Sequence, residues 1–407
     1  MSLPESPAGL TNAPFPADPA PPDDLPPVDP RLLALRAALA GIMTVAGEYH
    51  GRQPNQGRLY IFRGKLTQPP QRAFTLLKER FHPLDFRPML LNEHGEDAVV
   101  AIEGLNAERP VRTRPWLHLA LLLLTVITTT AMGAALTGIP SGDILRAIQT
   151  QRWHIVWSAL RDGLPFSLTL LGILGVHEMG HYIAARRHGI QVTLPFFIPL
   201  PLPNSLGTMG AVIFIKSPLH NRRALFDVGL AGPLAGLLVA LPLYLIGLGR
   251  PQTVGLPLSW IEMGITRVSN PPLLSALAGW VYPEMTNLDR VVLYGHPMAL
   301  AAWFGVLLTG LNLLPLGQFD GGHVAYALLG RRAWPLAYAT FALLIVMGVM
   351  GAWIAWLIWA LIGFFTGLRH PPPQDDLTPL GWWRVALGVL TAILFALIIV
   401  PVPFYTG

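Results

Sequence analysis

Three ionisable side chains interrupt one of the most apolar stretches of this 407-residue chain. His177, Glu178 and His181 form the pattern His-Glu-x-x-His, directly after the run LPFSLTLLGILG. On an α-helix, positions i and i+4 differ by about 40° of rotation and one turn of rise, so both imidazoles project from one face. They can bind a single metal ion, and Glu178 lies beside them, where it can accept a proton from a water on that metal.

The apolar setting strengthens this interpretation. A bare pair of histidines at this spacing more often marks two satisfied polar groups than a metal site. A charged Glu inside a membrane span costs at least a few kcal/mol, so ionisable groups at such positions usually mark function.

A third ligand must come from elsewhere in the chain, because a catalytic zinc ion normally has three protein ligands and one water. The best candidate is Asp320 in LNLLPLGQFDGGH (311–323), where an apolar span breaks at Pro315. Alone, Asp320 would more often be an Asp-Gly turn at a helix end. Beside the His-Glu-x-x-His pattern, metal binding becomes the stronger interpretation.

Two further polar residues flank Asp320. Asn312 lies about two turns earlier and can either donate to a developing oxyanion or bond a neighbouring helix. His323 is either a fourth ligand, a partner of the ligands, or a histidine at a helix interface, and the pattern favours the interface.

The elements that must position these residues are membrane helices. Runs of about 20 apolar residues predict transmembrane helices. We expect about seven, at 116–138, 164–187, 224–249, 296–317, 333–349, 350–368 and 382–404. The second and fourth run in the same direction, so His181 and Asp320 should finish at similar depth.

Short basic segments predict the orientation, because cytoplasmic loops carry an excess of Lys and Arg. These residues are Arg109, Arg112, Arg114, Arg186, Arg187, Lys216, Arg222, Arg223, Arg331, Arg332 and Arg369. The amino terminus is then cytoplasmic, and the loop 250–295 and the carboxyl terminus lie outside. The expected fold class is an all-α polytopic membrane protein with a re-entrant β-like loop and a small amino-terminal α+β domain.

The first 110 residues have a different character. Residues 1–30 are rich in Pro and acids and predict a disordered tail rather than a targeting signal. Residues 31–110 predict a small soluble domain, with a short helix within 32–47 and a β-α-β-β order over 58–104. We expect a docking or regulatory role for it, and residues 111–407 form the membrane domain.

The composition excludes several classes. Hydrophobic residues make up 52% and charged residues 13%, about half the charged fraction of a soluble domain. There is no Cys, which excludes disulfides and thiolate ligands. The net charge of +5 reflects loop bias, and we expect a lipid bilayer and no nucleic acid as partner.

With both motifs in view, the chain resembles the site-2 proteases, intramembrane zinc metalloproteases, in their branch without a PDZ domain, found in bacteria and chloroplasts. The resemblance rests on His177-Glu178-Met179-Gly180-His181, on Asn312-Leu-Leu-Pro315 with Asp320-Gly321, and on flanks such as NRRALFDVGLAGPLAG (221–236). It implies one zinc ion on His177, His181 and Asp320, with Glu178 as general base. It also implies single-span membrane-protein substrates and a bacterial plasma membrane.

Substrate handling and the competing functions remain open. The Pro-rich segment 195–217 forbids a continuous helix, and its GTMGAVIFI run has strand character, so it either captures an unwound substrate by strand addition or merely fills space. A metal permease or transporter, or an inactive scaffold, are the alternatives. Glu178 separates them best, because hydrolysis requires it and ion coordination does not.

Overall fold

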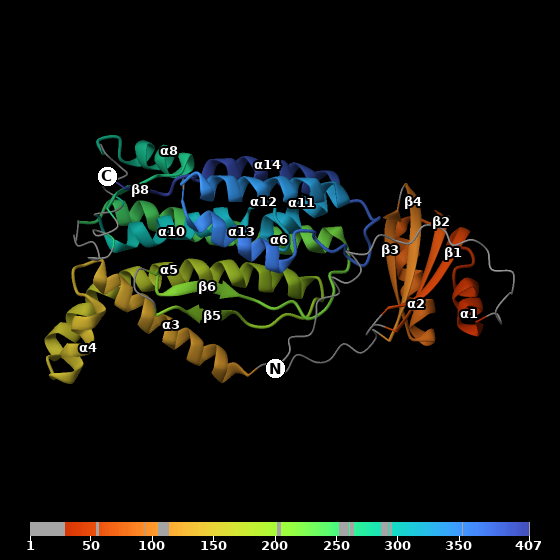
Figure 1. Ribbon diagram of the computed structural model, residues 1–407, viewed down its shortest axis with the longest axis horizontal. Helices are drawn as coiled ribbons and strands as arrows, with labels where there is room; N and C mark the ends of the chain where they lie inside the picture. The colour runs from red at the N-terminus through yellow and green to blue at the C-terminus, as the bar shows by residue number, and fades with distance from the viewer. Residues whose placement is uncertain are drawn as a thin grey trace.

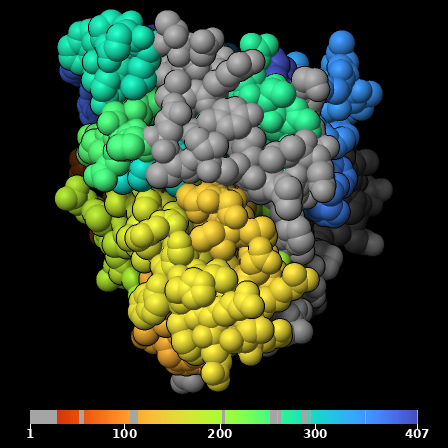
Figure 2. All heavy atoms as spheres, turned by 90° about the vertical axis from the view of Figure 1, so that its left-hand side faces the viewer, coloured from red at the N-terminus to blue at the C-terminus, as the bar shows by residue number. Residues whose placement is uncertain are grey.

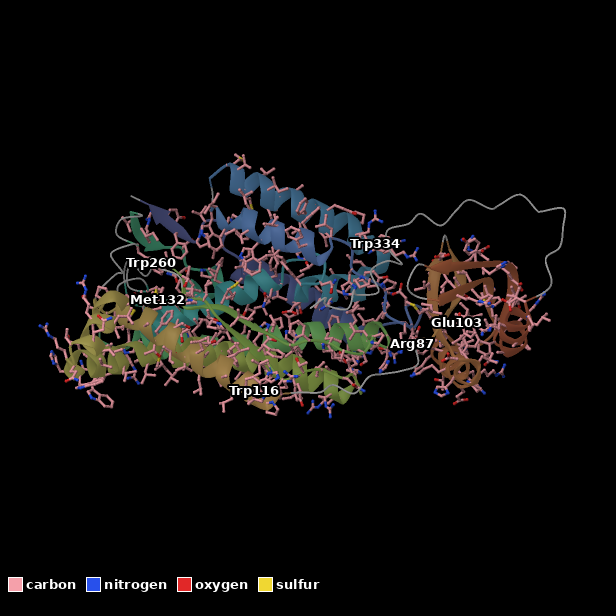
Figure 3. The ribbon with its side chains drawn as sticks, turned by 60° about the horizontal axis from the view of Figure 1, so that its bottom comes forward. Arg87, Glu103, Trp116, Met132, Trp260 and Trp334 are labelled. Carbon is pink, nitrogen blue, oxygen red and sulfur yellow. The ribbon has the colours of Figure 1, made fainter. Side chains whose placement is uncertain are left out.

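The computed structural model describes residues 29–53, 57–93, 95–104, 114–201, 205–251, 260, 264–285, 292, 295–351 and 353–406. Most of the predicted tail, the basic residues Arg109 and Arg112, and much of the loop 250–295 lie outside these ranges. A β-sheet with two helices forms one end, and a long bundle of helices forms the rest (Figure 1). In Figure 3, Arg87 and Glu103 mark the sheet, whereas Met132 and Trp260 lie together at the opposite end.

The sheet has four antiparallel strands in the order β1-β2-β4-β3. Its elements are α1 (Pro30–Ala38), β1 (Met43–Gln53), β2 (Gly57–Leu66), α2 (Pro70–Phe81), β3 (Phe86–Glu93) and β4 (Glu96–Glu103). One face packs against α2, where Ala73, Leu77 and Phe81 are buried with the sheet residues Tyr60 and Phe62. On β3, Phe86 and Leu90 belong to this core. Because side chains alternate along a strand, Glu93 points to the opposite face of the sheet.

The expected short helix within 32–47 is wrong in its second half. The helix ends at Ala38, Gly41 adopts a φ of +72°, and β1 begins at Met43. A positive φ is incompatible with helix continuation and suits glycine. Pairing of Met43 with Leu66 then adds β1 to the edge of β2, a non-local contact that local sequence patterns do not reveal.

The bundle is built from ten helices within the described residues. They are α3 (Pro115–Ala135), α4 (Ser141–Gln149), α5 (Trp153–Arg187), α6 (Arg222–Leu248), α8 (Pro272–Val281), α10 (Pro297–Asn312), α11 (Asp320–Leu329), α12 (Ala333–Val349), α13 (Ala355–Thr366) and α14 (Trp382–Ile398). Helices α3, α8 and α10 begin with Pro, which suits the first turn because its missing N–H would have no intrahelical partner.

Among the described residues, four stretches are long and apolar enough to cross a membrane: Pro115–Ala135, Trp153–Arg187, Arg222–Leu248 and Asp320–Val349. The last contains Gly330 at a φ of +60°, which separates α11 from α12. The predicted spans 296–317, 350–368 and 382–404 correspond to the shorter apolar helices α10, α13 and α14. Among the described residues, helix length and composition therefore support four crossings, fewer than the seven that the sequence predicts.

Large apolar side chains cover the outside of the bundle. Leu123, Ile127, Leu343, Val349 and Phe365 are all more than half exposed, and they come from α3, α12 and α13. A soluble protein rarely exposes so much apolar surface, whereas lipid-facing helices require it. The end opposite the sheet faces the viewer in Figure 2, where yellow side chains of α4 and the start of α5 form its lower half.

The segment 195–217 contains an antiparallel hairpin of β5 (Phe196–Pro199) and β6 (Thr208–Val212). It lies alongside α3 and α5 (Figure 1). The ring of His118 on α3 lies 3.0 Å from the carbonyl oxygen of Pro195, and the Thr128 hydroxyl donates to the carbonyl of Gly207 over 2.6 Å. A second small sheet pairs β7 (Ile265–Val268) with β8 (Phe404–Thr406).

Candidate metal centre

His177 and His181 lie on one face of α5, in its second half. Both are buried, with 3% and 6% of their surface exposed. Their Nε2 atoms are 3.1 Å apart, as the spacing of one helical turn allows. The helix thus presents two imidazole nitrogens to one point inside the bundle.

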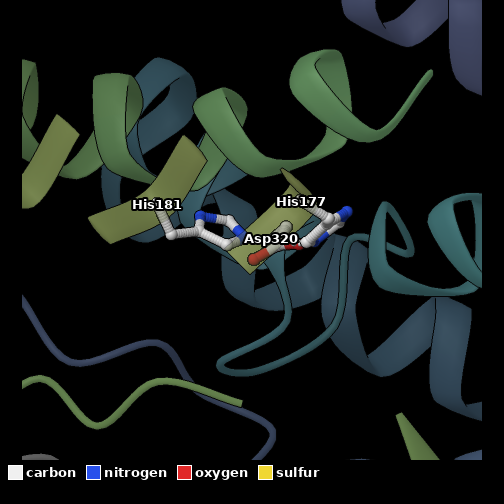
Figure 4. A group of neighbouring side chains, drawn as sticks. All are labelled: His177, His181 and Asp320. Carbon is white, nitrogen blue, oxygen red and sulfur yellow. Dashed lines mark hydrogen bonds and ion pairs between the residues drawn. The ribbon is translucent and has the colours of Figure 1, made fainter. Parts of the chain in front are cut away.

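Asp320 reaches the same point from another helix. Helix α10 ends at Asn312, a turn follows in which Gly317 has a φ of +50°, and α11 begins at Asp320. The Asp320 Oδ2 atom lies 3.2 Å from His177 Nε2 and 3.3 Å from His181 Nε2 (Figure 4). Among the described residues these three side chains form a group whose ligand atoms all lie within 4.8 Å of one another.

The donor set fits a divalent metal ion such as zinc. Two imidazole nitrogens and one carboxylate oxygen are the ligands of many catalytic zinc sites, which keep a fourth position open. The Nδ1 atom of His181 lies 2.7 Å from the backbone carbonyl oxygen of Val228 on α6. Since a carbonyl only accepts, Nδ1 carries the proton and donates a hydrogen bond to the Val228 carbonyl. The Nε2 lone pair then points to the other two ligand atoms, the arrangement typical of a metal-binding His.

Helix α6 approaches this face of α5 through glycines. A Cβ atom on Gly232 would lie 2.1 Å from His181 Nε2, and one on Gly236 would lie 3.2 Å from His177 Cβ. The motif AGPLAG (231–236), which contains both, therefore allows backbone and imidazole to meet. Any larger residue at 232 would occupy the position of the His181 ring.

Glu178 lies next to the three-residue group but is not part of it. Its side chain is buried, and the backbone of Ile213, which follows β6, lies near its carboxylate. The hairpin therefore ends against the residue that would serve as general base. This contact joins the two features that the sequence suggested separately, the His-Glu-x-x-His helix and the segment 195–217.

Asn312 and His323 have different surroundings. The Asn312 Nδ2 atom lies 3.5 Å from His177 Nε2, so this amide borders the group. His323 does not join it, and its Nδ1 lies 2.6 Å from Nε2 of His370. The interface interpretation of His323 agrees with this contact, although its partner comes from the segment between α13 and α14.

The sequence pattern does not reveal that Gly232 and Gly236 face the two imidazoles, nor that His370 and Asp376 contact the helix that begins with Asp320. The available signal was the stretch RHPPPQDD (369–376). It combines a His and two acids between two very apolar helices, which suggests that it packs against protein rather than lipid.

The comparison with known families matches residues 165–355 to the model of peptidase family M50. This range contains both motifs and the helices α6 and α10 between them.

Curated relatives are similar over a larger part of the chain. The chain is 30% identical over 376 residues to "Probable zinc metalloprotease EGY2, chloroplastic" of Arabidopsis thaliana, which covers 88% of this chain and 62% of the relative. It is 28% identical to the Arabidopsis thaliana EGY1 protein of the same description, over 70% of this chain and 52% of the relative. An EGY3 protein of Oryza sativa subsp. indica is 30% identical, over 70% and 48% respectively.

The chain thus spans about half to three fifths of the length of these relatives. No solved structure matches the chain significantly.

Proposed function

Because the chain belongs, through residues 165–355, to peptidase family M50, the site-2 protease family, we propose that it is an intramembrane zinc endopeptidase. It would hydrolyse peptide bonds within or near the transmembrane segments of single-span membrane proteins. The observation that carries the proposal is the convergence of His177, His181 and Asp320 on one point between apolar helices, with Glu178 beside them.

Each residue has a distinct part in the proposed reaction. His177, His181 and Asp320 hold the zinc ion, which when bound acts as a Lewis acid toward the scissile carbonyl and its attacking water. Glu178 accepts the proton of that water and then donates it to the leaving amine. The Asn312 amide lies 3.5 Å from His177 Nε2, and we propose that it donates a hydrogen bond to the oxyanion.

The hairpin β5–β6 is the proposed substrate platform. A helical peptide bond in lipid is hydrogen-bonded and shielded, so a substrate must unwind before it is cut. The unwound backbone then needs new partners, and a sheet edge supplies them by strand addition. Helix α5 packs beside β6, and Ile213 immediately after β6 lies near Glu178, so a strand added there would pass the general base.

The proposed topology has about seven crossings, with α10, α13 and α14 added to the longer helices. The amino terminus lies on the cytoplasmic side, and the domains are the tail 1–30, the α+β domain 31–110 and the membrane domain 111–407. We propose the bacterial plasma membrane as the location. The chloroplast in the names of the relatives is the other membrane system to be considered.

The decisive experiment compares purified wild type with Glu178→Gln on a panel of single-span substrates, with the zinc content of each measured. The wild type should hold about one zinc ion per chain and cleave. The variant should hold the same zinc and cleave at least about a hundredfold more slowly, because loss of general acid–base catalysis costs about 10²–10⁴-fold.

Asp162→Asn is the matched control, because Asp162 lies on the same helix and bonds only to neighbours on that helix among the contacts described. It should cleave like wild type. Asp320→Ala should lose zinc. Equal cleavage by wild type and Glu178→Gln, or zinc-loaded wild type that cleaves no substrate, would contradict the protease. Unchanged zinc content in Asp320→Ala would remove Asp320 from the ligand set.

A further inference from the structure

The segment 370–378, here called the strap, lies between α13 and α14 and joins the sheet to the bundle. The backbone N–H of Leu90 on β3 donates to the carbonyl of Gln374 over 2.7 Å, and the N–H of Asp376 donates to the carbonyl of Leu90 over 2.9 Å. On its other side, the N–H of Gln374 donates to the carbonyl of Leu219, just before α6. The strap therefore forms isolated β-bridges at Asp375, one with Leu90 at the edge of the sheet and one with Asn221 at the start of α6.

Side chains of the strap reach α11, the helix that begins with Asp320. The hydroxyl of Tyr326 donates to Asp376 Oδ2 over 3.1 Å, and the His323 and His370 rings are in contact at 2.6 Å between nitrogens. Tyr326, His370 and Asp376 are all buried. His323 and Tyr326 lie about one and two turns after Asp320, so the strap contacts α11 along most of its length.

Two ion pairs join the strap and the sheet to the helical bundle. Arg222, the first residue of α6, lies 3.4 Å from Asp376 Oδ1. Glu93, at the end of β3, is 1% exposed and lies 3.6 Å from Arg331, which follows α11. A buried charge without its partner is strongly destabilising. These pairs therefore favour the arrangement in which the sheet, the strap and α11 are docked together.

Asp320 is sensitive to the placement of α11 because it is the first residue of that helix. The turn before it is tightly packed, since a Cβ on Gly321 would lie 2.0 Å from the carbonyl oxygen of Leu313. Asp320 therefore cannot move independently of the helix. A displacement of about 1 Å at a site of this kind can cost about a hundredfold in rate.

We propose that the strap is the positioning element of the metal centre. The sheet holds the strap, the strap holds α11, and α11 sets the position of the Asp320 carboxylate. Tyr326 and Asp376 are then positioning residues that act on the zinc site without touching it. This inference rests on the proposed function in that it assigns zinc to His177, His181 and Asp320.

The test measures the zinc affinity of the purified full chain by competition with a chelator. Tyr326→Phe removes only the hydroxyl that bonds Asp376, and it should weaken zinc binding about tenfold, the lower end of what partners of metal ligands contribute. Asp376→Ala, which removes the acceptor of the Tyr326 hydroxyl, should weaken it to a similar extent. The loss of zinc affinity in the double variant should not exceed the larger of the two single losses, because both residues belong to one contact.

Tyr338→Phe is the matched control. Its hydroxyl accepts a hydrogen bond from Arg369, next to the strap, and it lies on α12; among the contacts described, no hydrogen bond joins its side chain to α11. Zinc affinity should be unchanged in this variant. If Tyr326→Phe lowers the midpoint of thermal unfolding but leaves zinc affinity at the wild-type value, Tyr326 is merely structural and the proposal is wrong.

The measurement needs no proteolysis, so it can be made in the Glu178→Gln background. Failure of the proposed protease would appear as zinc-loaded wild type that cleaves nothing. Failure of the strap proposal would appear as equal zinc affinities in wild type and Tyr326→Phe. The two failures are therefore distinguishable.

Discussion

At the scale of single residues, the metal centre depends on small side chains as much as on its ligands. The His181 ring occupies space that a methyl group on Gly232 would need, and its Nδ1 bonds the carbonyl of Val228 one turn earlier on α6. The same helix thus makes room for the imidazole and fixes its tautomer. Histidine supplies the ligand atom, but glycine determines whether that atom can reach the site.

Gly232→Ala should therefore weaken zinc binding. Alanine is the better helix former by about 1 kcal/mol, yet its Cβ would displace the His181 ring. We expect zinc affinity to fall by at least about tenfold, measured by chelator competition. Gly172→Ala on α5 is the control, because a Cβ there meets nothing within 4 Å. Wild-type affinity in Gly232→Ala would show that the ring can move aside without loss.

At the scale of elements, the strap shows that a segment without helix can hold several helices in place. It connects β3, the start of α6 and α11, and it carries the buried carboxyl of Asp376. Burial raises the pKa of Asp376 to about 6, and the nearby charge of Asp375 adds to the rise. The positive charges of Arg222 and Arg331 and the hydrogen bond from Tyr326 lower the pKa but do not cancel the effect of burial.

Docking of the strap should therefore depend on pH. When the strap is released, Asp376 returns to its ordinary pKa near 3.8, so the docked state binds more protons between about pH 4 and 6. Docking is then tightest below about pH 4 and weakens as the pH rises through 6, by up to about tenfold per pH unit. Hydrogen exchange of the Leu90 and Asp376 amides, corrected for intrinsic rates, reports this change.

Asp376→Asn should remove that pH dependence, because no carboxyl remains to titrate in the buried site. A variant whose protection still falls between pH 4 and 6 would assign the dependence to another group. Protection that rises with pH in the wild type would contradict the direction of the pKa shift.

At the scale of the whole molecule, the chain has separate hydrophobic cores in its two parts. One core lies between the sheet and α2, and the other fills the helical bundle around Trp303 and Phe304. The described contacts between the parts run through the strap and through Glu93 and Arg331. Separate cores with a narrow junction allow one part to open while the other stays folded.

Removal of zinc should therefore loosen the bundle selectively. A ligand at about one hundred times its dissociation constant stabilises the state that binds it by about 2.7 kcal/mol. With a chelator, exchange in α11 and the second half of α5 should accelerate by up to about a hundredfold, whereas β2 and β4 should not change. Asp320→Ala should show no response to the chelator. Equal acceleration in the sheet would mean that both parts open as one unit.

Much of the helical fold follows from the sequence because membrane helices are dictated by local composition. Runs of apolar residues marked α3, α5, α6 and α12, since each residue in lipid must satisfy its backbone within the helix. The strands of the sheet are harder to predict, because a strand is defined by its pairing with segments that are distant in the sequence. The strand β1 was missed because its evidence lies in pairing with β2, and α4 was missed because it is short and amphipathic.

By itself, the sequence determined the chemistry available to this protein: two histidines one turn apart, a glutamate between them, and an aspartate where a later apolar span breaks. Those are properties of spacing and composition. Only the tertiary structure decided that Asp320 lies 3.2 Å from His177, that Gly232 admits the His181 ring, and that the strap reaches Tyr326. These contacts join segments that are remote in the chain, so no local pattern records them.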